Sequence, residues 1–147
     1  MSLVPRVQEE LTEARLARDA DRRDALSLVL NALLAARKEL GRTLTDEECL
    51  QVLQRERKRR IEAAEAFRNA GREEQAEAEE YELEVLEEFM PEQLSEEEIE
   101  DIIDDVISEV GATSIRDIGR VMAGVMHQVS GRADGSVVSQ LVKEKLA

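Results

Sequence analysis

Apolar residues recur at helical spacing along almost the whole chain, and no segment alternates between apolar and polar residues as a half-buried strand would. This pattern constrains the fold more than any single motif does, because it leaves helix packing as the way to bury the apolar surface. Aromatic residues make up only 2% of the chain, so aliphatic side chains must build the core. We therefore predict an all-α fold.

Capping residues and glycines mark where the helices begin and end. Thr45 and Ser95 are each followed three residues later by Glu, which is the pattern of a capping box at a helix start. Gly41 and Gly111 follow apolar helical segments, where glycine favours a helix end, and Pro91 stops the segment before it. The predicted helices span about residues 3–14, 26–40, 45–70, 72–90, 95–110 and 114–129, with a last helix after residue 135.

The proline also divides the chain into two predicted domains. Before it we expect an N-terminal helical domain of about four helices, residues 1–90, and after it a small three-helix C-terminal domain, residues 91–147. The fourth helix of the first domain is expected to bury one line of side chains. This line consists of Ala78, Tyr81, Val85 and Phe89.

Charge is distributed unevenly along this acidic chain. The formal net charge of -14 repels phosphate backbones and membrane surfaces unless the basic residues gather in one patch. Residues 91–110 contain nine acidic residues and no basic ones, whereas residues 111–147 contain five basic and three acidic residues, a balance of +2. The scarcity of aromatic side chains argues against recognition of single strands by base stacking.

A basic run at residues 55–60 has two interpretations. Five of its six residues are basic, which is typical of a nucleic-acid contact. If the third and fourth helices fold back on each other, however, the run lies opposite acidic residues, and helical phase turns Arg57 and Arg60 toward the apolar face. Buried guanidinium groups need carboxylate partners, so we favour an intramolecular ion-pair seam over an RNA-facing patch. The partners in this seam are Glu82, Glu84 and Glu87.

The predicted helix 114–129 carries a basic face opposite its apolar face. Arg116, Arg120 and His127 fall within about 40° of one another on a helical projection. Further basic residues follow between this helix and the C-terminal end. The candidate RNA-binding residues are therefore Arg116, Arg120, His127, Arg132, Lys143 and Lys145.

Small residues lie on or beside the same face. They are Gly119, Ala123 and Gly124. Without bulky side chains, this part of the helix lets the backbone of a ligand approach closely between the arginines. The alternative is that a neighbouring helix packs there and that the arginines are solvated at its rim.

Two glycines bracket a basic and an acidic residue in the segment Gly131-Arg132-Ala133-Asp134-Gly135. Glycine allows backbone angles that are closed to other residues, and Asp134 can cap the helix that follows. We expect this segment to be a hinge between two short helices beside the basic face. Arg132 is its candidate phosphate contact.

The residues predict no catalytic, cofactor-binding or metal site. His127 has no His or Cys partner at metal-ligand spacing, and the acidic residues between 96 and 105 suit the positive end of a helix dipole better than a cation. Cys49 lies in the first turn of a predicted helix, where the dipole lowers a thiol pKa. Because the only His is far away in the sequence, we expect a structural thiol.

Several features predict a cytoplasmic protein without a membrane partner. The single cysteine forms no internal disulfide, and the first six residues lack the apolar core of a signal peptide. The longest apolar-leaning stretch is about half of what a membrane span requires.

Three motifs resemble those of the YqeY family. They are Phe89-Met90-Pro91-Glu92-Gln93-Leu94-Ser95-Glu96-Glu97-Glu98, then Gly119-Arg120-Val121-Met122, and then Gly131-Arg132-Ala133-Asp134-Gly135 with Val138 and Leu141-Val142-Lys143. The similarity to this family covers essentially the whole chain. The chain also resembles the helical tail of the B subunit (GatB) of the aspartyl/glutamyl-tRNA amidotransferase. It implies an N-terminal helical domain followed by a smaller helical domain.

The resemblance also implies a function that involves tRNA. In the amidotransferase the tail domain helps to hold the tRNA while other parts of the enzyme make the amide. By resemblance, this chain is expected to be a non-catalytic module of translation that binds tRNA or a tRNA-dependent enzyme. Two alternatives stay open, namely an acidic adaptor between proteins and an accessory part of a carbon-nitrogen ligase that uses glutamine as amido donor. No cofactor is expected.

Overall fold

The predicted all-α fold is confirmed by a computed structural model, which describes residues 2–147 of the chain. Within that range there are seven α-helices and one 3-10 helix, and no β-strand. The helices fall into two compact units, of which the first runs to Pro91 and the second from Glu92 to Ala147. No helix among residues 2–147 has both the length and the apolar character needed to cross a membrane.

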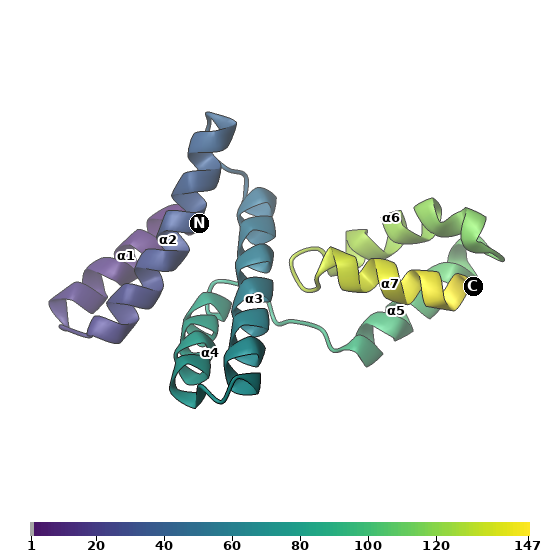
Figure 1. Cartoon of the computed structure of the whole chain (residues 1–147). Coiled ribbons are helices and arrows are strands. Elements are labelled where there is room, and N and C mark those ends of the chain that lie inside the picture. The colour runs from purple at the N-terminus through teal and green to yellow at the C-terminus, as the bar shows by residue number, and fades with distance from the viewer. Residues whose placement is uncertain (1) are drawn as a thin grey trace. The chain divides into compact units, whose positions relative to one another are not determined.

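The first unit consists of two helical hairpins (Figure 1). α1 (Leu3–Leu16) packs along α2 (Ala20–Leu40), and α3 (Asp46–Asn69) packs along α4 (Glu73–Glu87). α2 also contacts α3 and α4, and these contacts join the two hairpins.

The helix ends follow from local hydrogen bonds. Gly41 ends α2 in the left-handed region with φ of 71°, and Thr45 forms the predicted reciprocal capping box with Glu48 at the start of α3. The start of α2 differs from the prediction, because Asp19 caps it by accepting a hydrogen bond from the N–H of Arg22 at 3.1 Å. The helix therefore includes a polar first turn that precedes its apolar residues.

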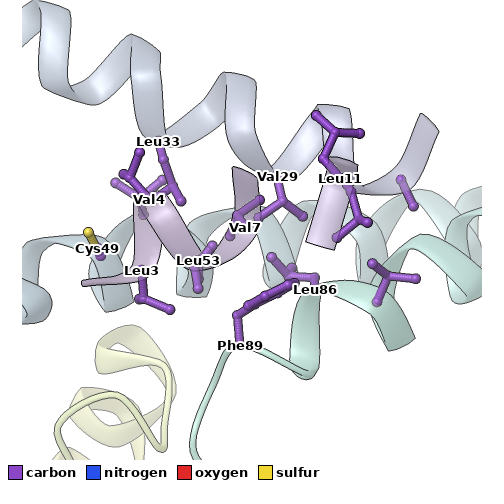
Figure 2. Close-up of a cluster of buried hydrophobic side chains, with 14 of the residues drawn as sticks. Leu3, Val4, Val7, Leu11, Val29, Leu33, Cys49, Leu53, Leu86 and Phe89 are labelled. Atoms are coloured by element: carbon purple, nitrogen blue, oxygen red, sulfur yellow. The ribbon is translucent and has the colours of Figure 1, made fainter. Parts of the chain in front are cut away.

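Aliphatic side chains from all four helices form the core of the first unit (Figure 2). α1 buries one line of side chains at helical spacing, and buried side chains of α2, α3 and α4 pack against this line. The labelled core residues are Leu3, Val4, Val7, Leu11, Val29, Leu33, Cys49, Leu53, Leu86 and Phe89. Cys49 is 1% exposed, and burial raises the pKa of its thiol. The predicted structural role fits this position, because desolvation disfavours the reactive thiolate despite the nearby helix start.

The buried line of α4 is only partly the predicted one. Val85 and Phe89 are buried and Tyr81 is half-buried, but Ala78 is exposed and Ala76 is buried in its place. Glu79 and Glu82 lie half-buried along the side of α4 that packs on α3, which rotates the buried line.

The second unit contains three α-helices and a short 3-10 helix. α5 (Glu96–Val110) is followed by η1 (Ile115–Asp117), α6 (Ile118–Val129) and α7 (Gly135–Leu146), and each α-helix contacts the other two. The core is aliphatic. Its fully buried side chains are Ile103, Val106, Val121, Val125, Val129, Val138 and Val142.

Candidate nucleic-acid interface

A tight turn between α5 and α6 sets the orientation of the basic residues. Gly111 ends α5 in the left-handed region, and Ser114 forms a capping box with Asp117 at the start of η1. The predicted helix 114–129 is therefore split, because this cap winds its first residues into a 3-10 turn. Arg116 consequently belongs to η1 and not to α6.

The apolar side of α6 faces the core, which leaves its opposite side to solvent. Val121, Val125 and Val129 are fully buried. On the other side an exposed row runs from η1 along α6, at intervals of four, three and four residues, so its members share one face. We call this row the α6 stripe; it consists of Arg116, Arg120, Ala123 and His127.

The small residues of α6 have two different roles, helix packing for one and open surface for the others. A side chain at Gly124 would bring its Cβ within 2.8 Å of Val106 Cγ1, so this glycine serves the packing of α6 on α5. Gly119 and Ala123 are exposed, and a Cβ added at Gly119 would meet no atom within 4 Å. Open helix surface therefore remains beside the arginines.

Arg120 is held in place although its side chain is 61% exposed. Its Nη2 donates to Asp117 Oδ1 at 2.7 Å, and its Nη1 donates to the carbonyl of Val110 at 3.3 Å. Asp117 also accepts hydrogen bonds from the N–H groups of Thr113 and Ser114. These N–H groups and the guanidinium lower the pKa of Asp117 to about 2. The guanidinium of Arg120 is thus both accessible and pre-ordered.

The glycine-containing loop before α7 anchors the segment that enters the second unit. Gly131 adopts φ of 77°, and its carbonyl accepts a hydrogen bond from Gln93 Nε2 at 2.9 Å. Leu94 N–H donates to the carbonyl of Arg132 at 2.9 Å, and Arg132 Nε donates to the carbonyl of Glu92 at 3.3 Å. These hydrogen bonds therefore hold residues 92–94 against the loop that precedes α7.

This anchoring was missed by reasoning from the sequence. The segment 89–98 and the loop 131–135 were considered as separate motifs, and the loop was expected to be a hinge. The predicted cap is present, since Asp134 accepts from the N–H of Ser136 at 2.8 Å. No local signal in the sequence indicates that the two motifs contact each other, because they are far apart along the chain.

The remaining candidate residues differ in their exposure and in the contacts that their side chains make. Lys143 and His127 are exposed. Lys145 forms an ion pair with Asp104 of α5 at 3.2 Å, and Arg132 is half-buried with its guanidinium partly engaged by Glu92. The structure therefore separates exposed cations from cations that also hold the fold together.

The basic run of α3 forms much of the predicted ion-pair seam with α4. Arg60 pairs with Glu82 at 3.1 Å and with Glu79 at 3.7 Å, and Arg57 Nε lies 3.8 Å from Glu87. The Arg60 side chain is 19% exposed, as expected from its helical phase. Burial, together with the neighbouring Glu79 carboxylate, raises the pKa of Glu82.

The prediction that Glu84 belongs to the seam is wrong. Glu84 is exposed, and Glu79 contributes a carboxylate instead because it lies one helical turn from Glu82 on the side of α4 that faces α3. The exposed members of the basic run are Arg55, Lys58 and Arg59.

Among residues 2–147, no group of three or more His, Cys, Asp or Glu side chains is arranged to hold a metal ion.

Comparison with known proteins confirms the resemblance noted from the motifs. The model of the family described as Yqey-like protein matches residues 4–146. An uncharacterized protein of Schizosaccharomyces pombe is 33% identical over 86 residues, which cover 58% of this chain and 70% of that protein. The protein named Altered inheritance of mitochondria protein 41, mitochondrial, of Pyrenophora tritici-repentis is 28% identical over 144 residues, 97% of this chain and 80% of that protein. The cytoplasmic location of this chain stays a prediction.

Proposed function

The chain belongs to the YqeY family, and from this premise we propose that it is a non-catalytic helical module whose second unit binds tRNA. The family is related to the tail of the tRNA amidotransferase B subunit, which makes tRNA the first nucleic acid to consider. The α6 stripe carries the proposal, because it combines exposed cations with helix surface that has no bulky side chains.

The geometry of the stripe suits contacts to phosphate groups. Arg120 binds a phosphate oxygen without first losing side-chain freedom, because Asp117 and Val110 already hold its guanidinium. Arg116, one turn earlier, is exposed and adds a second cation on the same face. The open surface at Gly119 lets a sugar-phosphate backbone approach the helix between the two arginines.

The acidic character of the chain makes this contact weak and sensitive to salt. Only about three or four cations of the second unit are exposed for phosphate contacts, and each contributes about 0.7 to 0.9 to the slope of log K against log salt. We therefore expect a slope of about -2 to -4. Shape recognition of a folded RNA supplies the selectivity, since few aromatic rings exist for base stacking.

Filter binding of folded tRNA at two salt concentrations tests the proposal. The variants of choice are Arg116→Gln and Lys143→Gln, because both side chains are exposed. Replacing Arg120 or Arg132 would also remove contacts that support the fold. Arg72→Gln is the matched control, since Arg72 is an exposed arginine of the first unit and the substitution changes the net charge by the same amount.

The expected result is that Arg116→Gln and Lys143→Gln weaken binding several-fold and make the salt slope less steep, while Arg72→Gln does neither. A protein that retains no tRNA even at low salt would refute the proposal. If Arg59→Gln weakens binding and Arg116→Gln does not, the exposed side of α3 is the contact and the assignment to α6 is wrong.

A second candidate function, a protein adaptor, is favoured by a shallow cleft between α3 and α4. The cleft has a volume of about 300 Å³. It is lined by Ile61, Ala64, Glu65, Arg68, Asn69, Glu80 and Leu83. Arg68 pairs with Glu73 and Glu80, so the rim keeps an acidic excess around an apolar floor. A basic, partly apolar segment of another protein fits this chemistry, and a pull-down that survives nuclease treatment supports it.

The third possibility is an accessory part of a carbon-nitrogen ligase. Its test is amide formation by the purified chain with glutamine, ATP and charged tRNA. We expect no product from the chain alone, and product formation would refute the non-catalytic assignment.

A further inference from the structure

The turn that joins α1 to α2 lies at the end of the first hairpin (Figure 1). A cleft with a volume of about 330 Å³ opens at this turn. It is lined by Ala14, Arg15, Arg18, Asp19, Ala20 and Arg23. Three guanidinium groups and one carboxylate thus surround a single cleft on a chain whose net charge is -14. We call it the arginine cleft.

The charges of the arginine cleft are only partly compensated. The Asp19 carboxylate is engaged as the cap of α2, and Arg23 pairs with Asp24 at 3.0 Å. The guanidinium groups of Arg15 and Arg18 make neither an ion pair nor a hydrogen bond within residues 2–147. In contrast, the neighbouring Arg22 is bound by two carboxylates, from α1 and from the residue after α4. Two exposed cations are therefore available to an anion.

Arg18 occupies a backbone conformation that normally requires glycine. Its φ is 55°, and it is the only described residue other than glycine with a positive φ. The turn is fixed by hydrogen bonds from Arg18 N–H to the Arg15 carbonyl and from Asp19 N–H to the Ala14 carbonyl. The four other positions with positive φ carry glycine. An arginine here costs stability that glycine would not, which indicates a use for its side chain.

We propose that the arginine cleft binds a phosphate group. Guanidinium groups donate paired hydrogen bonds to oxyanions, and the several oxygens of a phosphate can serve more than one arginine, whereas a carboxylate has two. The first turn of α2 adds the positive end of a helix dipole beside the cleft. The group belongs to a nucleotide or an RNA, or is free phosphate, and these sources share the same chemistry.

Titration of the ¹⁵N-labelled full chain with inorganic phosphate tests the site. Acetate at the same ionic strength is the control anion. Phosphate is expected to shift the amide signals of residues 15–23 in a saturable manner, and acetate is not. The absence of a saturable shift with phosphate would overturn the proposal.

Substitutions separate binding from folding. Arg18→Gly is expected to weaken phosphate binding by about tenfold or more, as for the loss of a charge-assisted hydrogen bond, while Tm stays equal or rises because the positive φ is relieved. Arg15→Gln, at an ordinary helical position, is expected to weaken binding similarly. Arg72→Gln outside the cleft leaves binding unchanged. Phosphate affinity of Arg18→Gly equal to that of the native chain would refute the assignment.

Two further probes identify the source of the phosphate. AMP that binds more tightly than inorganic phosphate points to a nucleotide, and a short RNA that binds only with its 5′-phosphate points to an RNA end. Equal affinity of all three probes points to the phosphate group alone. Each of these results supports the cleft, and failure of all three probes to saturate it overturns the proposal. The outcome is independent of the α6 stripe, which is tested with other variants in the other unit.

Discussion

Replacing Gly124 by alanine is expected to destabilise the second unit, although alanine is the better helix former. A Cβ at this position would lie 2.8 Å from Cγ1 and 3.6 Å from Cγ2 of Val106. Val106 is 1% exposed and β-branched, so its methyl groups have little room to move away. Overpacking of this kind costs about 1–3 kcal/mol.

Gly119 provides the matched control on the same helix. A Cβ there meets no atom within 4 Å, and its backbone is not in the left-handed region. Alanine gains up to about 1 kcal/mol over glycine in a helix, and this gain largely cancels when the two variants are compared. The difference in free energy of unfolding between Gly119→Ala and Gly124→Ala therefore isolates the contact with Val106. We expect Gly119→Ala to be the more stable by about 1–3 kcal/mol.

Hydrogen exchange of the α5 and α6 amides measures this difference. Tyr81, the only tyrosine, lies in the first unit, so its fluorescence serves as the control that this unit is unchanged. In a double-mutant cycle, Val106→Ala should cost less in the Gly124→Ala background than in the native chain. Equal stability of the two alanine variants, or additive effects in the cycle, would refute the packing argument.

Three further predictions concern the seam, the acid response and the entry segment. Glu82→Lys should lower the free energy of unfolding of the first unit by about 1–3 kcal/mol in urea denaturation, because it places a cation against a half-buried guanidinium, whereas the exposed Glu84→Lys should change it by less than about 0.5 kcal/mol. Backbone N–H groups and a guanidinium hold the pKa of Asp117 at about 2, below its ordinary 3.8. The folded state thus binds fewer protons than the unfolded state, so the stability that Asp117 contributes is complete above pH 3.8 and is lost as the pH falls toward 2. Amide exchange of the second unit, measured as a function of pH, should show this loss in the native chain and not in Asp117→Asn. Gln93→Ala should accelerate exchange of the Leu94 amide several-fold, because the loss of the hydrogen bond from Gln93 to the Gly131 carbonyl loosens the segment; unchanged exchange would show that this hydrogen bond contributes no local stability.

Helix identity and most helix ends could be predicted because they depend on neighbouring residues. The capping boxes at Thr45 and Ser95 form within four residues, and Gly41 and Gly111 end their helices in the left-handed region. The early start of α2 has an equally local cause in Asp19. It was missed because the prediction followed apolar residues, and the first turn of α2 is polar.

Contacts between distant segments could not be predicted in the same way. Helical phase correctly turned Arg60 toward α4, but it gave no register between the two helices, so Glu84 was chosen where Glu79 makes the contact. The exposed side of α6 followed from phase alone, whereas the engagement of Arg120 with Val110 depends on the path of the turn after α5. Register and loop path are tertiary properties, and one sequence leaves them open.

The hydrogen bonds of the second unit show that the family motifs have a structural role in this chain. The motif around Gln93 and the loop at Gly131 and Arg132 contact each other, so their residues are explained by the need to hold the entry segment against the loop before α7. These motifs therefore specify the fold of the second unit. The proposed RNA contact depends instead on exposed cations whose side chains make no hydrogen bond or ion pair among the described residues, above all Arg116 and Lys143. Binding that depends on these two side chains, in variants that melt like the native chain, would be attributable to the RNA contact itself.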